Sequence, residues 1–146
     1  VAPDLVRDKD GVSAALRIAE LAAGLKQAGS TLLARLDELA DTYGRYATDQ
    51  HSIRVDDLSI IDETMCRIRA IPPPTLLGES VTVEDLMPDT DAVRWRWSGG
   101  RVVVRPSGTE PKLKAYLEVM EPSGSAEVAA AALARLRAEI AALLDG

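Results

Sequence analysis

The sequence predicts an α+β protein in which helices pack on one face of an antiparallel sheet. Two observations support this class. Apolar and polar residues alternate, with the period of a half-buried strand, at 51–55, 93–97, 101–105 and 113–119. Helix-length runs lie around these strands, and several of the strands are joined by tight turns, which favours antiparallel pairing.

Residues 11–27 predict a first helix with Asp10 as its N-cap. Its apolar residues at helical spacing are Val12, Leu16, Ala19 and Ala23, and those on its other faces are Ile18, Leu21 and Leu25. A helix that is apolar on nearly every side needs burial on several sides. Few partners remain for it in this chain, so we expect a neighbouring domain outside these residues.

Gly29 and Ser30 break the first helix, and Ser30 or Thr31 is expected to cap a second one. The apolar stripe of the second helix consists of Leu32, Leu36, Leu39 and Tyr43. Gly44 ends this helix.

Beyond Gly44, residues 45–50 are polar and predict a link before the strand 51–55. A helix follows, starting at Asp56 or Asp57 and stopped by the proline run 72–74. Its expected apolar face consists of Leu58, Ile61, Met65 and Ile68. Val81 and Val83 then predict a short strand.

Residues 98–100 form a turn between the strands 93–97 and 101–105. On the strand 113–119, one face is expected to carry Leu113, Ala115, Leu117 and Val119, and the other Lys114, Tyr116 and Glu118. Ser125 is expected to cap the last helix, 126–144. The apolar side of that helix consists of Val128, Ala132, Leu136, Ile140 and Leu143.

The composition is that of a soluble globular protein, with 47% hydrophobic and 27% charged residues in a chain of 146. A net charge of −6 argues against a nucleic-acid partner. No apolar run is long enough to span a bilayer and no signal peptide is visible, so we expect no membrane partner and a cytoplasmic location. The lone Cys66 is expected to be a small buried thiol, and the lone His51 lacks Cys or His partners for a metal.

The candidate functional site is the segment 105–114, Arg-Pro-Ser-Gly-Thr-Glu-Pro-Lys-Leu-Lys, between two predicted strands. Ser107 and Thr109 offer hydroxyls, and the backbone around them offers N–H groups. Gly108 lacks the side chain that would block a ligand, and Arg105 adds a planar fork of donors. This combination suits a dianionic phosphoryl group.

The same residues also suit an ordinary hairpin turn with Arg105 as an exposed strand residue. Local charge favours the phosphate interpretation, because this stretch of an acidic chain is basic and is opposed only by Glu110. Its basic residues are Arg94, Arg96, Arg101, Arg105, Lys112 and Lys114. A basic island of this kind also fits the solvated face of a sheet.

The string R-P-S-G-T-E-P-K-L-K at 105–114 resembles the phosphate-binding loop in the last domain of the α-D-phosphohexomutases, the phosphoglucomutase and phosphomannomutase superfamily. Residues 8–16 resemble the stretch that opens the last helix of the family's third domain, and residues 29–44 fit the connection that follows. The resemblance implies that 1–44 are a two-helix remnant of an α/β domain with a hinge. It also implies that 45–146 are the C-terminal phosphate-binding domain, with a fold like that of the TATA-binding protein.

Enzymes of this family are isomerases that move a phosphoryl group between the 1- and 6-positions of a hexose through a phosphoserine. The resemblance implies that the last domain holds the phosphate that is not being transferred. Its binding residues would be Arg105, Ser107, Gly108, Thr109 and Lys114. Its partners would be the hexose phosphate and the upstream domains of the same enzyme.

The family's phosphoserine, metal and sugar-reading loops are not found in the sequence. Residues 8–11 echo the metal loop but lack its third aspartate and its arginine. We therefore expect no catalytic residue and no bound metal or cofactor here, with Mg²⁺ belonging to the full-length parent. The chain begins at Val1 without Met, so we expect a C-terminal fragment that is inactive alone.

Two other classes stay open. One is a non-catalytic α+β regulatory module that binds a phosphorylated ligand. The other is a structural interaction domain whose basic island meets an acidic partner.

Overall fold

The computed structural model of the chain describes residues 3–4 and 6–145. The chain divides into two compact units, Val1–Tyr43 and Gly44–Gly146, and each is described by itself. Within the described residues, no helix combines the length and the apolar character needed to cross a bilayer.

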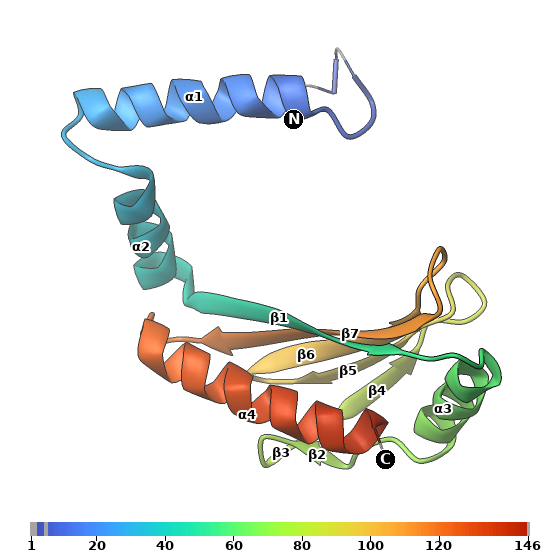
Figure 1. The fold of residues 1–146 in the computed structure, drawn as a ribbon. Helices are drawn as coiled ribbons and strands as arrows, with labels where there is room; N and C mark the ends of the chain where they lie inside the picture. The colour runs from blue at the N-terminus through green and yellow to red at the C-terminus, as the bar shows by residue number, and fades with distance from the viewer. Residues whose placement is uncertain (1–2, 5, 146) are drawn as a thin grey trace. The chain divides into compact units, whose positions relative to one another are not determined.

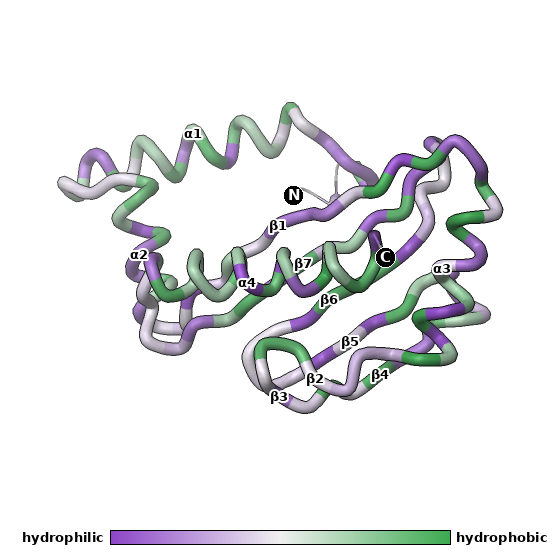
Figure 2. The backbone as a smooth tube through the Cα atoms, turned by 60° about the horizontal axis from the view of Figure 1, so that its bottom comes forward, coloured by the Kyte–Doolittle hydropathy of each residue, from purple (hydrophilic) through white to green (hydrophobic). Residues whose placement is uncertain are grey.

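The first unit begins with α1 (Gly11–Gln27). The Asp10 carboxylate accepts hydrogen bonds from the amides of Val12 (3.0 Å) and Ser13 (3.3 Å), which confirms the predicted N-cap. The pKa of Asp10 lies below its usual value chiefly because of the Ser13 side chain, and the amide bonds from Ser13 and Val12 lower it further. No α1 residue is buried, and Figure 2 shows apolar segments along the helix.

The second helix, α2 (Leu32–Tyr43), is capped by Thr31, whose Oγ1 accepts a hydrogen bond from Ala34 N (3.1 Å). Gly44 follows it with φ of 84°, in the left-handed region. A Cβ at this glycine would lie 3.0 Å from the carbonyl oxygen of Glu121. Both the backbone conformation and the lack of space therefore require glycine where the chain enters the second unit.

The second unit is built on a five-stranded antiparallel sheet with the order β1-β7-β6-β5-β4 (Figure 1). The strands are β1 (Arg45–Arg54), β4 (Thr82–Asp85), β5 (Val93–Trp97), β6 (Gly100–Pro106) and β7 (Lys112–Glu121). Two helices on one face are α3 (Ser59–Ala70) and α4 (Ala126–Leu144). This architecture confirms the predicted α+β class.

The hydrophobic core lies between the sheet and its two helices. The strands contribute Val93, Trp95, Val102, Val104, Leu113, Ala115, Leu117 and Val119, and the helices contribute Ile61, Met65, Ile68, Leu136, Ile140 and Leu144. The apolar face predicted for the strand 113–119 is confirmed, since all four of its residues are buried.

The other face of the sheet is called the open face here. The strand register and the alternating burial place on it Thr48, Gln50, Ser52, Arg54, Glu84, Arg94, Arg96, Arg101, Val103, Arg105, Lys112, Lys114, Tyr116 and Glu118. Polar and charged residues dominate this set, as expected for a sheet surface that is not packed against the core.

The prediction of a polar link at 45–50 is wrong, because these residues form the first part of β1. The helix-facing side chains there include Arg45 and Asp49, so the usual alternation of apolar residues is missing. The side chains of Arg45 and Asp49 form hydrogen bonds with residues far away in the sequence. Arg45 Nε donates to Gly124 O (2.9 Å), and Arg137 Nη1 donates to Asp49 Oδ2 (2.5 Å).

In the second unit, three residues that were expected to be buried or to lie on an apolar face are exposed. Cys66 lies on the outer side of α3, so the prediction of a buried thiol is wrong. Leu58 is 62% exposed because it precedes the first turn of α3. Val128 is 51% exposed because the first turn of α4 buries its neighbour Ala129 instead.

A two-stranded hairpin, β2 (Thr75–Leu76) and β3 (Glu79–Ser80), was not predicted. Strands of two residues are too short to show an alternating pattern. Val83 lies in β4 as predicted, but Val81 precedes that strand.

Candidate functional site

The candidate loop, residues 107–111, connects β6 and β7 at one end of the sheet. Hydrogen bonds fix its base, from Ser107 N to Lys112 O (2.8 Å) and from Lys112 N to Glu110 O (2.7 Å). Pro111 O also accepts a bond from Val55 N (3.1 Å), just beyond β1. The loop is thus anchored at its ends while its tip faces solvent.

The tip presents hydrogen-bond donors that are not used within the part of the chain that the structure describes. In residues 3–4 and 6–145, the N–H groups of Gly108 and Thr109 have no acceptor, and the hydroxyls of Ser107 and Thr109 make no hydrogen bond. Thr109 and Gly108 are exposed, and Ser107 is half-buried. Successive unpaired donors of this kind can surround a small anion.

Gly108 is not required by the fold. A Cβ built on it would meet nothing within 4 Å, and its φ lies outside the left-handed region. Neither packing nor backbone conformation therefore explains this glycine.

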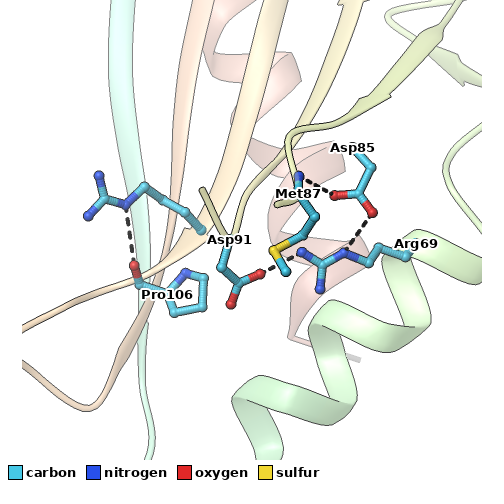
Figure 3. Close-up of polar contacts among 6 residues, drawn as sticks. Arg69, Asp85, Met87, Asp91 and Pro106 are labelled. Atoms are coloured by element: carbon cyan, nitrogen blue, oxygen red, sulfur yellow. Dashed lines mark hydrogen bonds and ion pairs between the residues drawn. The ribbon is translucent and has the colours of Figure 1, made fainter. Parts of the chain in front are cut away.

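Arg105 and Lys114 lie directly opposite each other on β6 and β7, and both occupy the open face. The Arg105 Nε donates to the carbonyl oxygen of its neighbour Pro106 (3.3 Å), a bond drawn in Figure 3. Within the described residues, neither cation forms an ion pair. The structure therefore brings together two of the predicted site residues, with their charges uncompensated, at the base of the loop.

Lys112 differs from these two cations because Glu110 neutralises it (Nζ to Oε1, 2.8 Å). This hydrogen bond lowers the pKa of the Glu110 carboxyl below its usual value of 4.5, and the fields of Lys114 and Arg54 add to the effect. Glu110 thus remains a carboxylate that orders the loop.

Arg54 joins this end of the open face and was missed by the sequence reasoning. It is the last residue of β1, is exposed, and lies opposite Lys112 in the register. The alternation at 51–55 placed it on the polar side of a strand. Only the pairing of β1 with β7, which the sequence does not reveal, brings it near the loop.

The basic island predicted at 94–114 is smaller than expected, because Glu110 is not its only counter-charge. Glu84 on β4 accepts hydrogen bonds from Arg94 Nε (2.9 Å) and Arg96 Nη1 (3.4 Å). The main cause of the lowered pKa of Glu84 is its bond with Arg94. Cross-strand pairing places these charges together, and the uncompensated cations are left at the loop end of the face.

Glu118 provides a second counter-charge, bound by both ends of the Arg101 guanidinium (2.9 and 3.0 Å). Next to this pair the open face is hollowed. The hollow has a volume of about 550 Å³, and Thr48, Gln50, Val103, Arg105 and Tyr116 also line it. Volumes of this size are common for small-molecule sites.

The described residues do not fit a Mg²⁺ site. In 3–4 and 6–145, no group of three or more His, Cys, Asp or Glu side chains is placed to hold a metal ion. Asp8 is engaged by Lys9 through its amide (2.6 Å) and its ammonium (3.3 Å). Asp10 is occupied as the cap of α1.

Comparison with known proteins gives consistent matches. Residues 75–143 match the family model described as phosphoglucomutase/phosphomannomutase, C-terminal domain. A probable phosphomannomutase from Haemophilus influenzae is 43% identical over 123 residues, covering 81% of this chain and 25% of that protein. A phosphoglucomutase from Staphylococcus aureus is 31% identical over 135 residues, covering 78% of this chain and 24% of that protein. The chain thus spans about a quarter of the length of these relatives.

Proposed function

Because the chain belongs to the phosphoglucomutase/phosphomannomutase family and carries its C-terminal domain, we propose that it holds one phosphate of a hexose phosphate in a phosphosugar mutase. The phosphate held is the one that is not transferred. The main support is the set of unused donors at residues 107–109, which lies beside the uncompensated cations Arg105 and Lys114.

Each residue has a role that its chemistry suits. The guanidinium of Arg105 binds two phosphate oxygens at once, while Lys114 supplies a point charge. The hydroxyls of Ser107 and Thr109 donate to the remaining oxygen, together with the N–H groups at Gly108 and Thr109. A dianion gains most from such a site, because hydrogen bonds to charged groups are the strongest.

In this proposal the domain positions the substrate and does not make or break bonds. Holding the distant phosphate places the reacting end of the sugar for in-line transfer. The phosphoserine, the sugar-reading groups and Mg²⁺ belong to parts of the enzyme outside these 146 residues, Mg²⁺ supplying charge stabilisation to the transferring phosphoryl group. The 146-residue chain alone is therefore expected to have no mutase activity.

The test is an NMR titration of the 146-residue chain with inorganic phosphate and then with glucose 6-phosphate. We expect the amide signals of Gly108 and Thr109 to shift with both ligands. Arg105→Ala should raise the Kd about tenfold or more, since a lost charge-assisted pair has that effect. The matched control is Arg96→Ala, on the same face but paired with Glu84, and it should bind as the unaltered chain does.

Unmoved loop signals at millimolar ligand, or equal Kd values for the Arg105→Ala and Arg96→Ala variants, would overturn the proposal. In a full-length enzyme, Arg105→Ala should lower turnover by about 10²-fold, because misplacing the substrate has an effect of that size.

A further inference from the structure

The hollow on the open face adjoins the proposed phosphate site, and Arg105 belongs to both. The strand register divides this part of the face into rows. Ser52, Lys114 and Arg105 lie in one row near the loop, and Gln50, Tyr116 and Val103 lie in the next row away from it. The step between the rows is about 7 Å, since two residues of a strand advance that far, and it is comparable with the span of one sugar ring.

The second row has the chemistry of a carbohydrate platform. Tyr116 is 39% exposed and lies opposite the apolar Val103 on the neighbouring strand, so an apolar surface is available for the face of a pyranose. Gln50 and Thr48 carry groups that both donate and accept hydrogen bonds. Such groups can bind sugar hydroxyls, which also donate and accept hydrogen bonds.

The far end of the hollow cannot serve as a second phosphate site. There the Arg101 guanidinium is held by the Glu118 carboxylate through one hydrogen bond and a second ion-pair contact. A second phosphate would have to displace that carboxylate or lie against it. The hollow thus has one cationic end, at Arg105 and Lys114, and one neutral end.

We propose that the hollow seats the sugar ring of the hexose monophosphate, with Tyr116 beneath the ring and Gln50 and Thr48 at its hydroxyls. The inference rests on the proposed phosphate site, from which the ring extends by one row. The domain then binds the whole hexose monophosphate and not the phosphate alone.

This platform must accept the ring in two orientations, because a mutase binds the sugar through either of its phosphorylated ends. Its groups meet that requirement. An aromatic face has no preferred direction for hydroxyls, and an amide or a hydroxyl exchanges donor for acceptor when the ring is turned. We therefore expect glucose 1-phosphate and glucose 6-phosphate to contact the same residues.

The experiment compares three ligands on the 146-residue chain by NMR: inorganic phosphate, glucose 1-phosphate and glucose 6-phosphate. Inorganic phosphate is expected to shift only signals of the loop and of Arg105. Both sugar phosphates should also shift the signals of Gln50, Val103 and Tyr116. This comparison uses the unaltered chain, so it does not depend on the folding of any variant.

A variant then measures the contribution of the aromatic ring. Tyr116→Ala should raise the Kd for either sugar phosphate about three- to tenfold and leave the Kd for inorganic phosphate unchanged. Tyr46→Ala is the matched control, since Tyr46 is 58% exposed on β1 and does not line the hollow. It should leave all three Kd values unchanged.

The outcomes separate the two proposals. If the sugar phosphates shift no signals beyond those that inorganic phosphate shifts, and Tyr116→Ala behaves as Tyr46→Ala does, the sugar platform is overturned while the phosphate site stands. If none of the three ligands shifts Gly108 or Arg105, the phosphate site itself is overturned, and the platform with it.

Discussion

Gly100 and Gly108 lie near the two ends of β6, and the space around them differs sharply. A Cβ on Gly100 would lie 2.2 Å from the carbonyl oxygen of Glu118 on β7, closer than any real contact. A Cβ on Gly108 would meet nothing within 4 Å. The first glycine is thus needed for the sheet to pair, and the second is not needed by the fold.

Alanine at these two positions should therefore have opposite effects. Gly100→Ala should lower the free energy of unfolding by about 1–3 kcal/mol or more, because the strands must move apart. Gly108→Ala should leave it unchanged or raise it by up to about 1 kcal/mol, while weakening phosphate binding by filling the loop. Urea unfolding and phosphate titration of both variants measure this. If the Gly108→Ala variant binds phosphate with unchanged affinity, the explanation that this position is a glycine to leave space for phosphate is wrong.

Asp49 is held by Arg137 on α4, and this hydrogen bond is the main cause of its pKa lying below the usual 3.8. The amide of Gln50 and the field of His51 lower it further. A carboxyl whose pKa is lowered by folding stabilises the folded state above its unfolded pKa, and this contribution is lost as the pH falls through the lowered value.

Arg137→Met should therefore destabilise the chain at pH 7 by less than about 1 kcal/mol, since both side chains are well exposed. The difference from the unaltered chain should shrink below pH 3.8 and vanish below the lowered pKa of Asp49. Urea unfolding as a function of pH measures it. Arg135→Met is the control, because Arg135 is exposed on the same helix and forms no ion pair in the described residues. A difference that persists at low pH would contradict this account.

At the residue scale, the sequence was informative where partners are close along the chain. The N-cap at Asp10 and the candidate loop from Arg105 to Thr109 could be predicted from the spacing of neighbouring residues alone. The counter-charges Glu84 and Glu118 could not be assigned to their arginines, because the cross-strand register that pairs them follows from the tertiary structure.

At the level of elements, α3 is tied to the loop that joins β4 and β5 (Figure 3). Arg69 on α3 reaches Asp85 Oδ2 with Nε (3.2 Å) and Asp91 Oδ1 with Nη2 (2.5 Å). These carboxylates raise the pKa of Arg69 above its usual value, chiefly through the bond to Asp91. Asp85 also accepts a hydrogen bond from Met87 N (3.2 Å), so the carboxylate that binds Arg69 also contacts the backbone of the loop.

Replacing Arg69 by methionine should lower the free energy of unfolding by about 1–2 kcal/mol, because two carboxylates lose their shared partner. A double-mutant cycle with Asp91→Asn, followed by urea unfolding, isolates the contribution of that pair. If the effects of the two substitutions on the free energy of unfolding are additive, the ion pair between Arg69 and Asp91 contributes nothing to stability.

The elements that were predicted well are those with strong periodicity and nearby turns. The strands β5, β6 and β7 and the helix α4 showed clear patterns, and each contributes to the core. The first half of β1 was missed because its inward side chains are partly charged. Their partners, Gly124 and Arg137, lie in other elements, so no local pattern could reveal the strand.

On the scale of the whole molecule, the core of the second unit is self-contained. Among residues 3–4 and 6–145, every member of the core cluster lies between residues 53 and 144, including the partly buried residues packed against it. The second unit should thus be able to fold without the first.

A chain reduced to residues 44–146 should therefore unfold cooperatively, with a Tm within a few degrees of that of the 146-residue chain. Its phosphate affinity should also be unchanged, because the site residues are all retained. Circular dichroism melts and the same NMR titration measure both. A reduced chain without a cooperative transition would show that the helices of the first unit are required.

The whole site, like the whole fold, was predictable only in part. The loop and its arginine are contiguous in sequence and could be proposed from spacing. Arg54 and Gln50 reach the same face only because β1 returns to pair with β7, and no pattern in a single sequence indicates that pairing.

The position of β1 at the edge of the sheet has a consequence for biosynthesis. Ribosomes make β1 before the strand β7, which is its sole neighbour in the sheet, so the nascent chain carries it unpaired while the later hairpins emerge. The unpaired strand is poorly suited to self-association because both of its faces carry polar side chains. These are Thr48, Gln50 and Ser52 on one face and Arg45 and Asp49 on the other. We expect the polar character that hid the first half of β1 from the periodicity analysis also to lower the tendency of the nascent chain to aggregate.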